Sequence, residues 1–161
     1  IEVGFVLVDG AQHVTLNGED VEGQIRTLEV GNRASQISAI KEVRAFLVAQ
    51  QQKMGEAKGI VMDGRDIGTV VFPKAELKLF LTASPEVRAQ RRYDELAAKG
   101  QPADYGTIFR EIQDRDYRDM HRDIAPLKQT EDATLVDTSD MTIEEVADRI
   151  LEIYREKAVK E

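Results

Sequence analysis

The stretch GIVMDGRDIGT, residues 59–69, joins a short apolar run to a turn that carries three charged side chains. The apolar run, residues 59–62, is typical of a short buried strand, and Asp63-Gly64 with Gly68 soon after is typical of the turn that ends one. The sequence therefore predicts charge at the carboxyl end of a strand. Ligands bind at that edge of an open α/β sheet, because its loops converge on a crevice. An ordinary charged turn has the same composition, so this stretch alone leaves both interpretations open.

Strand and helix patterns alternate through the rest of the second half. Two more apolar runs of strand length are LKLFLTA (77–83) and ATLVDTS (133–139). Each run is followed by a helical pattern or a long loop, which predicts an α/β fold with a parallel sheet flanked by helices. Ser84 and Pro85 suit the cap and the first position of the helix that follows the first of these runs.

A last helix is predicted from Thr142 onward, since Thr142 and Glu145 have the spacing of a capping box. Its expected buried stripe consists of Ile143, Val146, Ile150, Leu151 and Tyr154. The tail REKAVKE, residues 155–161, is expected to be frayed.

The N-terminal segment, residues 3–21, has a β pattern instead. Asp9-Gly10 and Asn17-Gly18 are turn dipeptides, which predict two or three short antiparallel strands. From about Ala34 the period changes. Apolar residues then recur at helical spacing, which predicts one amphipathic helix over residues 35–54 with Ser35 at or before its start. The apolar positions of this helix are Ile37, Ile40, Val43, Phe46 and Leu47.

A second group of charges lies in TIFREIQDRDYRDMHR, residues 107–122, which has a helical pattern. Arg115, Asp119 and Arg122 fall on one face of this helix, and Arg118 stands three and four positions from the two arginines. Guanidinium groups held together favour an anion between them and bind phosphate oxygens in pairs. A solvated face with weak Asp–Arg pairs is the alternative, and this helix alone does not decide between them.

The composition sets the broad class of the protein. With 161 residues, the chain is long enough for one domain with a core, and it contains no cysteine for disulfides or a thiolate zinc site. No apolar run approaches the roughly 20 residues of a membrane span, so a cytoplasmic protein without membrane contact is expected. The net charge of −8 argues against nucleic-acid binding. The first residue is Ile, so the true N-terminus is expected to lie elsewhere.

Four stretches, in this order and at this spacing, resemble the bacterial cytidylate kinases, nucleoside monophosphate kinases that phosphorylate CMP and dCMP. They are VGNRASQISAIKEVRAFL (30–47), GIVMDGRDIGTVVFP (59–73), RDYRDMHRDIAPL (115–127) and LVDTSDMTIEEV (135–146). The resemblance covers almost the whole chain. It implies a P-loop NTPase-like parallel sheet flanked by helices, with a small antiparallel β-rich insertion that binds the monophosphate.

The resemblance also implies a CMP pocket. It assigns Ser35 to the cytosine and Arg44 to the phosphate, and it places Arg65 and Asp66 in the same pocket, with Asp66 facing the cytosine edge. An aspartate accepts from the cytosine 4-amino group, whereas uracil presents a carbonyl there and is repelled. Preference for CMP over UMP follows from this difference.

For the transfer itself, the resemblance places Arg115 and Arg122 around the phosphates and Asp119 at the ribose. Together with Arg65, these arginines are the predicted catalytic groups, because phosphoryl transfer depends on positioning and on neutralising charge. The second substrate is expected to be ATP with Mg²⁺ bridging its phosphates.

The ATP side of the site has weaker signals. Asp63 is predicted to hold a metal-bound water, or else to cap its own turn. Thr138 and Ser139 match the loop that lines the adenine, or else form an ordinary turn and cap. On the helix after residue 84, a solvated face is favoured over ATP contact for Arg88, Arg91 and Arg92.

The resemblance divides the chain into two regions. Residues 1–33 are expected to form part of the β-rich CMP-binding insertion, and residues 34–161 the kinase core. A mobile lid that closes over ATP is expected at about residues 91–122.

One departure from the family stands out. The family begins with a strand and a phosphate-binding G-x-x-G-x-G-K-[ST] loop, and no such loop occurs in these 161 residues. The family's first strand lies between the strands corresponding to residues 59–63 and 77–81, so its absence is expected to leave exposed edges. A longer native protein is therefore expected, monomeric when complete, with this chain alone inactive. A non-catalytic CMP-binding module and a kinase for another monophosphate such as UMP remain the alternatives.

Overall fold

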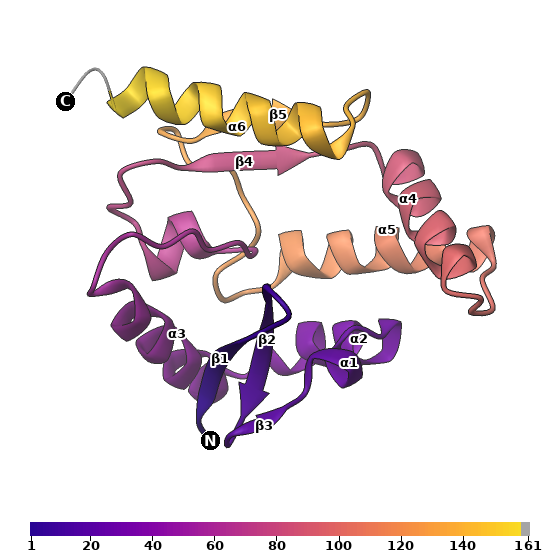
Figure 1. The fold of residues 1–161 in the computed structure, drawn as a ribbon, viewed down its shortest axis with the longest axis horizontal. Coiled ribbons are helices and arrows are strands. Elements are labelled where there is room, and N and C mark those ends of the chain that lie inside the picture. Colours follow the sequence, from indigo (N-terminus) through magenta and orange to yellow (C-terminus); the bar gives the residue numbers. More distant parts are fainter. Residues whose placement is uncertain (159–161) are drawn as a thin grey trace.

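The computed structural model describes residues 1–158 and shows a mixed α/β chain. A three-stranded antiparallel sheet forms the N-terminal part, and a parallel pair of strands, β4 (Leu79–Thr82) and β5 (Thr134–Asp137), lies at the opposite end of the molecule in Figure 1. Helix α5 (Tyr105–His121) crosses the space between them. The predicted class, a parallel sheet with helices and a small antiparallel β-rich part, is confirmed.

The antiparallel sheet consists of β1 (Val3–Val8), β2 (Ala11–Leu16) and β3 (Glu19–Asp20). Strands β1 and β2 pair from Val3↔Leu16 to Val8↔Ala11. Both predicted turns form as expected. Asp9, Gly10, Asn17 and Gly18 all have positive φ, the backbone that two-residue hairpin turns require.

Three helices follow: α1 (Glu22–Ile25), α2 (Leu28–Ile37) and α3 (Lys41–Gly55). The prediction of one helix over residues 35–54 is wrong, because the backbone of Ile40 is extended and separates α2 from α3. Ser38 supports this break by donating its hydroxyl to the carbonyl oxygen of Ser35 at 2.7 Å. Ser35 therefore lies inside α2 rather than at a helix start.

Helix α3 buries a charged residue in place of the predicted apolar stripe. Arg44 is the residue of α3 that is buried, whereas Phe46 and Leu47 are exposed, as are Ile37 and Ile40 before them. Periodicity fails here because the inner face of α3 meets the charged turn at Asp66, and a guanidinium satisfies that contact better than an apolar side chain.

The predicted strand at residues 59–62 is wrong. The segment is not paired in any described sheet, and Val61 is 103% exposed. A strand needs a neighbour to complete its hydrogen bonds, and within residues 1–158 strand β4 pairs only with β5. After Asp66 the chain forms a single π-helical turn, η1 (Ile67–Val71), closed by Phe72 N–H donating to the carbonyl oxygen of Ile67 at 2.7 Å. Such turns are frequent at functional sites.

Strands β4 (Leu79–Thr82) and β5 (Thr134–Asp137) form the predicted parallel ladder, from Leu79↔Thr134 to Thr82↔Asp137. Helix α6 (Ile143–Ala158) follows β5 and lies along the pair in Figure 1.

The capping box that begins α6 is confirmed. Glu145 N–H donates to Thr142 Oγ1 at 3.2 Å, and Thr142 N–H donates to Glu145 Oε2 at 2.8 Å. The buried stripe predicted for α6 is wrong for Ile143, Leu151 and Tyr154, which are exposed. Val146 and Ile150 are half-buried, and Ile153 is the buried residue. The predicted fraying is wrong for residues 155–158, which are helical, and residues 159–161 lie outside the described chain.

Helices α4 (Pro85–Ala98) and α5 pack against each other around Ala89, Leu96 and Ile108 (Figure 1). The predicted cap of α4 is confirmed, because Ser84 Oγ accepts from Val87 N–H at 3.2 Å. This helical pair and its connection carry the segment that the sequence assigns to a lid.

Candidate functional site

Asp119 is the centre of the site. It lies in the last turn of α5 and is 2% exposed. Ser35 Oγ of α2 donates to its Oδ1 at 3.1 Å, and Arg65 Nε, from the turn that precedes η1, donates to its Oδ2 at 3.1 Å. The structure thus joins two segments of the predicted pocket at one carboxylate.

Arg115 lies one helical turn before Asp119, with its Nε 3.7 Å from Asp119 Oδ2. Burial lowers the pKa of Arg115 most, and the positive charge of Arg65 lowers it further, while Asp119 acts in the opposite direction. Two guanidinium groups therefore compete for one carboxylate. An anion bound between Arg65 and Arg115 would relieve this repulsion.

Arg44 and Asp66 form a second pair, in which Arg44 Nη2 donates to Asp66 Oδ2. Arg44 Nη1 also donates to the carbonyl oxygen of Ser38 at 3.4 Å. Burial, followed by the nearby positive charge of Arg122, lowers the pKa of Arg44. The resemblance assigned Arg44 and Asp66 to opposite ends of CMP, but the structure brings them into direct contact.

Arg122 is the residue that ends α5, with an extended backbone (ψ 144°). Its Nε donates to the carbonyl oxygen of Ala125 at 2.7 Å, and its Nη1 donates to Ser38 Oγ at 3.1 Å. Its Nη2 is buried and has no hydrogen-bond partner among residues 1–158. A buried guanidinium nitrogen with free hydrogens is a ready donor to a ligand oxygen.

Taken together, four guanidinium groups face two carboxylates in this arginine cluster, so positive charge is in excess. The cluster consists of Ser35, Arg44, Arg65, Asp66, Arg115, Asp119 and Arg122. Its members come from α2, α3, the turn before η1 and the end of α5. Arg118 does not join it, since its guanidinium points to Asn32 Oδ1 at 3.3 Å on the surface. The arrangement suits an anion of several oxygens, such as a phosphate.

Thr138 and Ser139 lie apart from the cluster, directly after β5. Thr138 Oγ1 donates to the carbonyl oxygen of Thr82 at 3.0 Å, and Ser139 Oγ accepts from Ser84 N–H at 3.0 Å. Both hydroxyls therefore connect β4 and β5. Arg91 of α4 donates to Thr138 Oγ1 at 3.2 Å and to the carbonyl oxygen of Met141 at 3.0 Å.

The solvated face predicted for α4 is wrong for Arg88. Its Nη1 and Nη2 donate to the two carboxylate oxygens of Asp116 on α5 at 3.0 and 2.6 Å. Arg92 stays on its own helix, bonded to Glu95 at 2.6 Å. Arg88 thus holds α4 to α5, and Arg91 holds α4 to the loop after β5.

Asp63 is exposed at the turn before Arg65. The part of the chain that the structure describes contains no group of three His, Cys, Asp or Glu side chains that could hold a metal ion.

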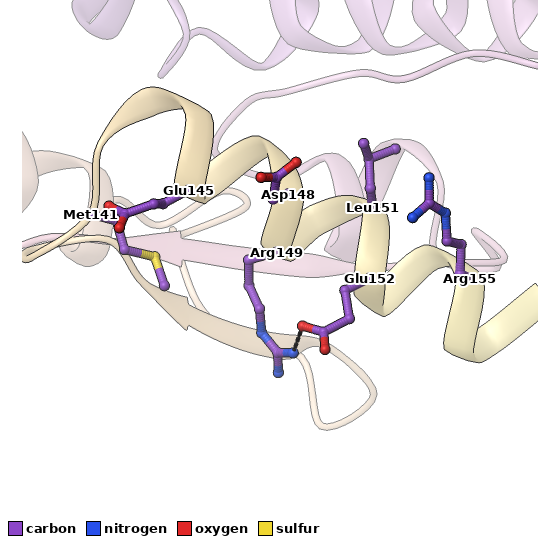
Figure 2. Close-up of a pocket in the computed structure, with 7 residues that line it drawn as sticks. All are labelled: Met141, Glu145, Asp148, Arg149, Leu151, Glu152 and Arg155. Atoms are coloured by element: carbon purple, nitrogen blue, oxygen red, sulfur yellow. Dashed lines mark hydrogen bonds and ion pairs between the residues drawn. The ribbon is translucent and has the colours of Figure 1, made fainter.

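Two hollows in the described part of the chain lie beside α6. One, of about 490 Å³, is drawn in Figure 2, where Arg149 and Glu152, three residues apart on α6, point toward one another. The other, of about 520 Å³, is lined by Asp137, Asp140, Met141 and Glu145. Neither contains a residue of the arginine cluster. The first is lined by side chains of both charge signs, and the second by three acidic side chains and Met141. The candidate site is therefore the arginine cluster, because its guanidinium donors converge and can bind an anion.

Comparison with known proteins identifies the family of the chain. The family model described as cytidylate kinase matches residues 4–156. The chain belongs to the cytidylate kinase family. This family has a P-loop NTPase fold, in keeping with the mixed α/β architecture.

Individual cytidylate kinases support the assignment. The chain is 54% identical over 151 residues to the cytidylate kinase of Bacteroides fragilis, covering 94% of this chain and 66% of that protein. It is 53% identical over 152 residues to that of Bacteroides thetaiotaomicron, with the same coverage, and 55% identical over 156 residues to that of Parabacteroides distasonis, covering 96% and 68%. The chain spans about two thirds of the length of these relatives. No helix within residues 1–158 is long and apolar enough to cross a membrane.

The sequence analysis did not predict one residue that contacts the cluster in this member of the cytidylate kinase family. Ser38 contacts both Arg44 and Arg122, although its residue type gives no signal of a role in the site. Its spacing of three from Ser35 is the available signal, since residues three apart on a helix share a face.

Proposed function

We propose that the complete protein transfers the γ-phosphoryl group of ATP to CMP or dCMP, giving CDP or dCDP. Family membership supports the reaction class. The observation that supports the proposal is the arginine cluster, in which excess positive charge lies beside Asp66, a carboxylate that Arg44 orients. A nucleoside monophosphate needs positive charge for its phosphate and an oriented acceptor for its base.

Asp66 is the proposed reader of the base. Its carboxylate accepts from the cytosine 4-amino group, and the O4 carbonyl of uracil would meet the same negative charge. Arg44 fixes the orientation of this carboxylate. The contact between them moves the proposed role of Arg44 from the phosphate to the support of Asp66.

Arg65, Arg115 and Arg122 are the proposed phosphate-binding and catalytic groups. Each lies at the cluster, and the buried, unpartnered Nη2 of Arg122 and the lowered pKa of Arg115 both favour a bound anion. During phosphoryl transfer, charge spreads over the equatorial oxygens of the moving group, and arginines placed beforehand stabilise it without reorganisation.

Asp119 and Ser35 are proposed to hold the nucleoside. In the structure, Asp119 receives hydrogen bonds from Ser35 and Arg65, so its carboxylate also orients the phosphate-binding arginine. If Asp119 contacts the ribose and Ser35 the cytosine, each must share its present hydrogen bonds with the ligand. An aspartate has about four acceptor sites, so sharing is compatible with its present partners.

Fewer contacts support the roles proposed on the ATP side of the site. Thr138 and Ser139 are proposed to border the adenine and Asp63 to hold a water of Mg²⁺, which would neutralise the donor phosphates when bound. A cytoplasmic monomer is the proposed form of the complete protein.

The test is a comparison of steady-state phosphorylation rates of the complete protein with ATP and either CMP, dCMP or UMP. We expect kcat/KM for CMP to exceed the value for UMP strongly. A calorimetric titration with CMP, with UMP as the control, reports binding separately. CMP binding without phosphoryl transfer would identify a binding module, and preference for UMP would identify a different kinase.

A further inference from the structure

Ser38 lies between Arg44 and Arg122, two arginines of the cluster, and contacts both. It follows α2 directly and is half-buried. Its carbonyl oxygen accepts from Arg44 Nη1 at 3.4 Å, and its hydroxyl oxygen lies 3.1 Å from Arg122 Nη1. One residue thus contacts the arginine that orients Asp66 and an arginine proposed to bind the phosphate.

The hydrogen bonds of the Ser38 hydroxyl fix its direction. Its single proton is donated to the carbonyl oxygen of Ser35 at 2.7 Å. A hydroxyl has one proton and two lone pairs, so the oxygen can only accept from Arg122. Because Ser35 and Ser38 belong to the end of one helix, the position of Arg122 is tied to the helix that carries Ser35.

Arg122 is held at two of its three nitrogens. Nε donates to Ala125 and Nη1 to Ser38, whereas Nη2 has no protein partner within the described chain. Ala125 lies only three residues from Arg122 and moves with the same loop. Ser38 is therefore the contact that connects the guanidinium of Arg122 to a different part of the protein.

We propose that Ser38 is a positioning residue that holds Arg122 Nη2 toward the phosphate of the bound monophosphate. This inference rests on the proposed CMP kinase function. Without the hydroxyl, Arg122 would keep its charge but lose its fixed orientation, and the loss would fall on recognition of the phosphate. Ser38 would then act through Arg122 and would not itself touch the substrate.

The test compares Ser38→Ala and Ser38→Thr in the complete protein, using CMP and cytidine as probes. Ser38→Ala should weaken CMP binding on the order of tenfold, since a hydrogen bond to a charged group is lost. Binding of cytidine, which has no phosphate, should stay within about twofold of the wild type, and Ser38→Thr, which keeps the hydroxyl, should restore CMP affinity.

A double-mutant cycle separates positioning from a structural effect. Ser38→Ala should add no further loss of CMP affinity to Arg122→Ala, because the two residues act as one unit. Thr27→Ala is the matched control, since Thr27 Oγ1 caps the other end of α2 by accepting from Val30 N–H at 3.2 Å. We expect this control to lower thermal stability without changing the ratio of CMP to cytidine affinity.

The outcomes distinguish the two proposals. Two outcomes would overturn the role of Ser38 while the proposed function stands, provided that the wild type binds CMP. In the first, Ser38→Ala leaves the ratio of CMP to cytidine affinity unchanged. In the second, the effects of Ser38→Ala and Arg122→Ala on CMP affinity add. If the wild type neither binds nor phosphorylates CMP, the proposed function fails and the role of Ser38 with it. Ser38→Cys, which keeps the volume but offers only a weak acceptor, replaces Ser38→Ala if that variant does not fold.

Discussion

Arg44 donates from Nη2 to the carboxylate of Asp66, and the two side chains are only 10% and 12% exposed. The pair joins α3 to the turn before η1, two segments separated by 22 positions. A buried ion pair is expensive to form but more expensive to break, because removing one partner leaves the other charge buried and uncompensated. The stability of the site and its recognition of the base therefore depend on the same contact.

Replacing Asp66 by Ala should destabilise the protein. Arg44 would remain buried without its counter-charge, so we expect the free energy of unfolding to fall by about 3–5 kcal/mol, measured by urea denaturation. The matched control is Glu76→Ala, which removes the exposed ion pair between Lys58 and Glu76. Exposed pairs contribute little, so the control should unfold like the wild type. Equal stability of the Asp66 and Glu76 variants would contradict a buried Arg44–Asp66 pair.

Replacing Asp66 by Asn should change base selectivity with a smaller structural change. Asparagine presents an NH₂ donor that can face the O4 carbonyl of uracil, whereas aspartate only accepts. We expect the ratio of kcat/KM for CMP over UMP to fall by at least about tenfold, mainly through slower use of CMP. Side-by-side initial rates at subsaturating nucleotide give this ratio directly. An unchanged ratio would remove Asp66 from the base-reading role.

The contact between Lys78 and Asp132 predicts a pH dependence of stability. Lys78 is 8% exposed, and its Nζ lies 2.7 Å from Asp132 Oδ2. The hydrogen bond from Lys78 holds the pKa of Asp132 below its ordinary value of 3.8. A carboxyl group with a lowered pKa stabilises the fold above the unfolded pKa, and this contribution is lost as the pH falls through the folded pKa.

Asp132→Asn should therefore be less stable than the wild type at about pH 6, and the difference should shrink as the pH falls below 3.8 and through the lowered pKa of Asp132. Urea midpoints measured across this range test the prediction. Asp148→Asn, on an exposed position of α6, is the control and should show no such pH-dependent difference. A gap that stays constant down to the lowest pH would mean that the charge of Asp132 is not the stabilising feature.

Gly55, the last residue of α3, is predicted to resist substitution. A Cβ at this position would lie 2.5 Å from Cε1 and Cζ of Phe72, which directly follows η1. Gly55→Ala must displace the ring of Phe72, and we expect a loss of about 1–2 kcal/mol in the free energy of unfolding. Gly23→Ala in α1 is the control, because no heavy atom lies within 4 Å of the added Cβ. Equal thermal midpoints for the two variants would show that Phe72 moves freely.

The features that the sequence predicted correctly have local signals. The hairpin turns at Asp9-Gly10 and Asn17-Gly18 depend on two adjacent residues with positive φ, and the caps of α4 and α6 depend on residues three positions apart. Such signals are complete within a short window. The parallel pair of strands also followed from apolar runs alone, since both runs have strand length.

Features that depend on distant contacts were predicted poorly. The strand expected at residues 59–62 needed a neighbour that the sequence pattern cannot place, and the stripe expected on α3 gave way to Arg44 because its partner Asp66 lies in another segment. The family resemblance selected the residues of the cluster. Their partners required the fold, as the contact of Ser35 with Asp119 across 84 positions illustrates.

Asp119 has a consequence for how the site opens. Its carboxylate receives Ser35 of α2 and Arg65 of the preceding turn, and its carbonyl oxygen accepts from Leu127 N–H at 2.7 Å. Unwinding the last turn of α5 would therefore release α2, the Arg65 turn and the segment around Leu127 together. We expect these three segments to form one cooperative unit. A nucleotide that touches any one of them stabilises all three, and amide hydrogen exchange should slow together in α2, in the Arg65 turn and around Leu127 when CMP binds.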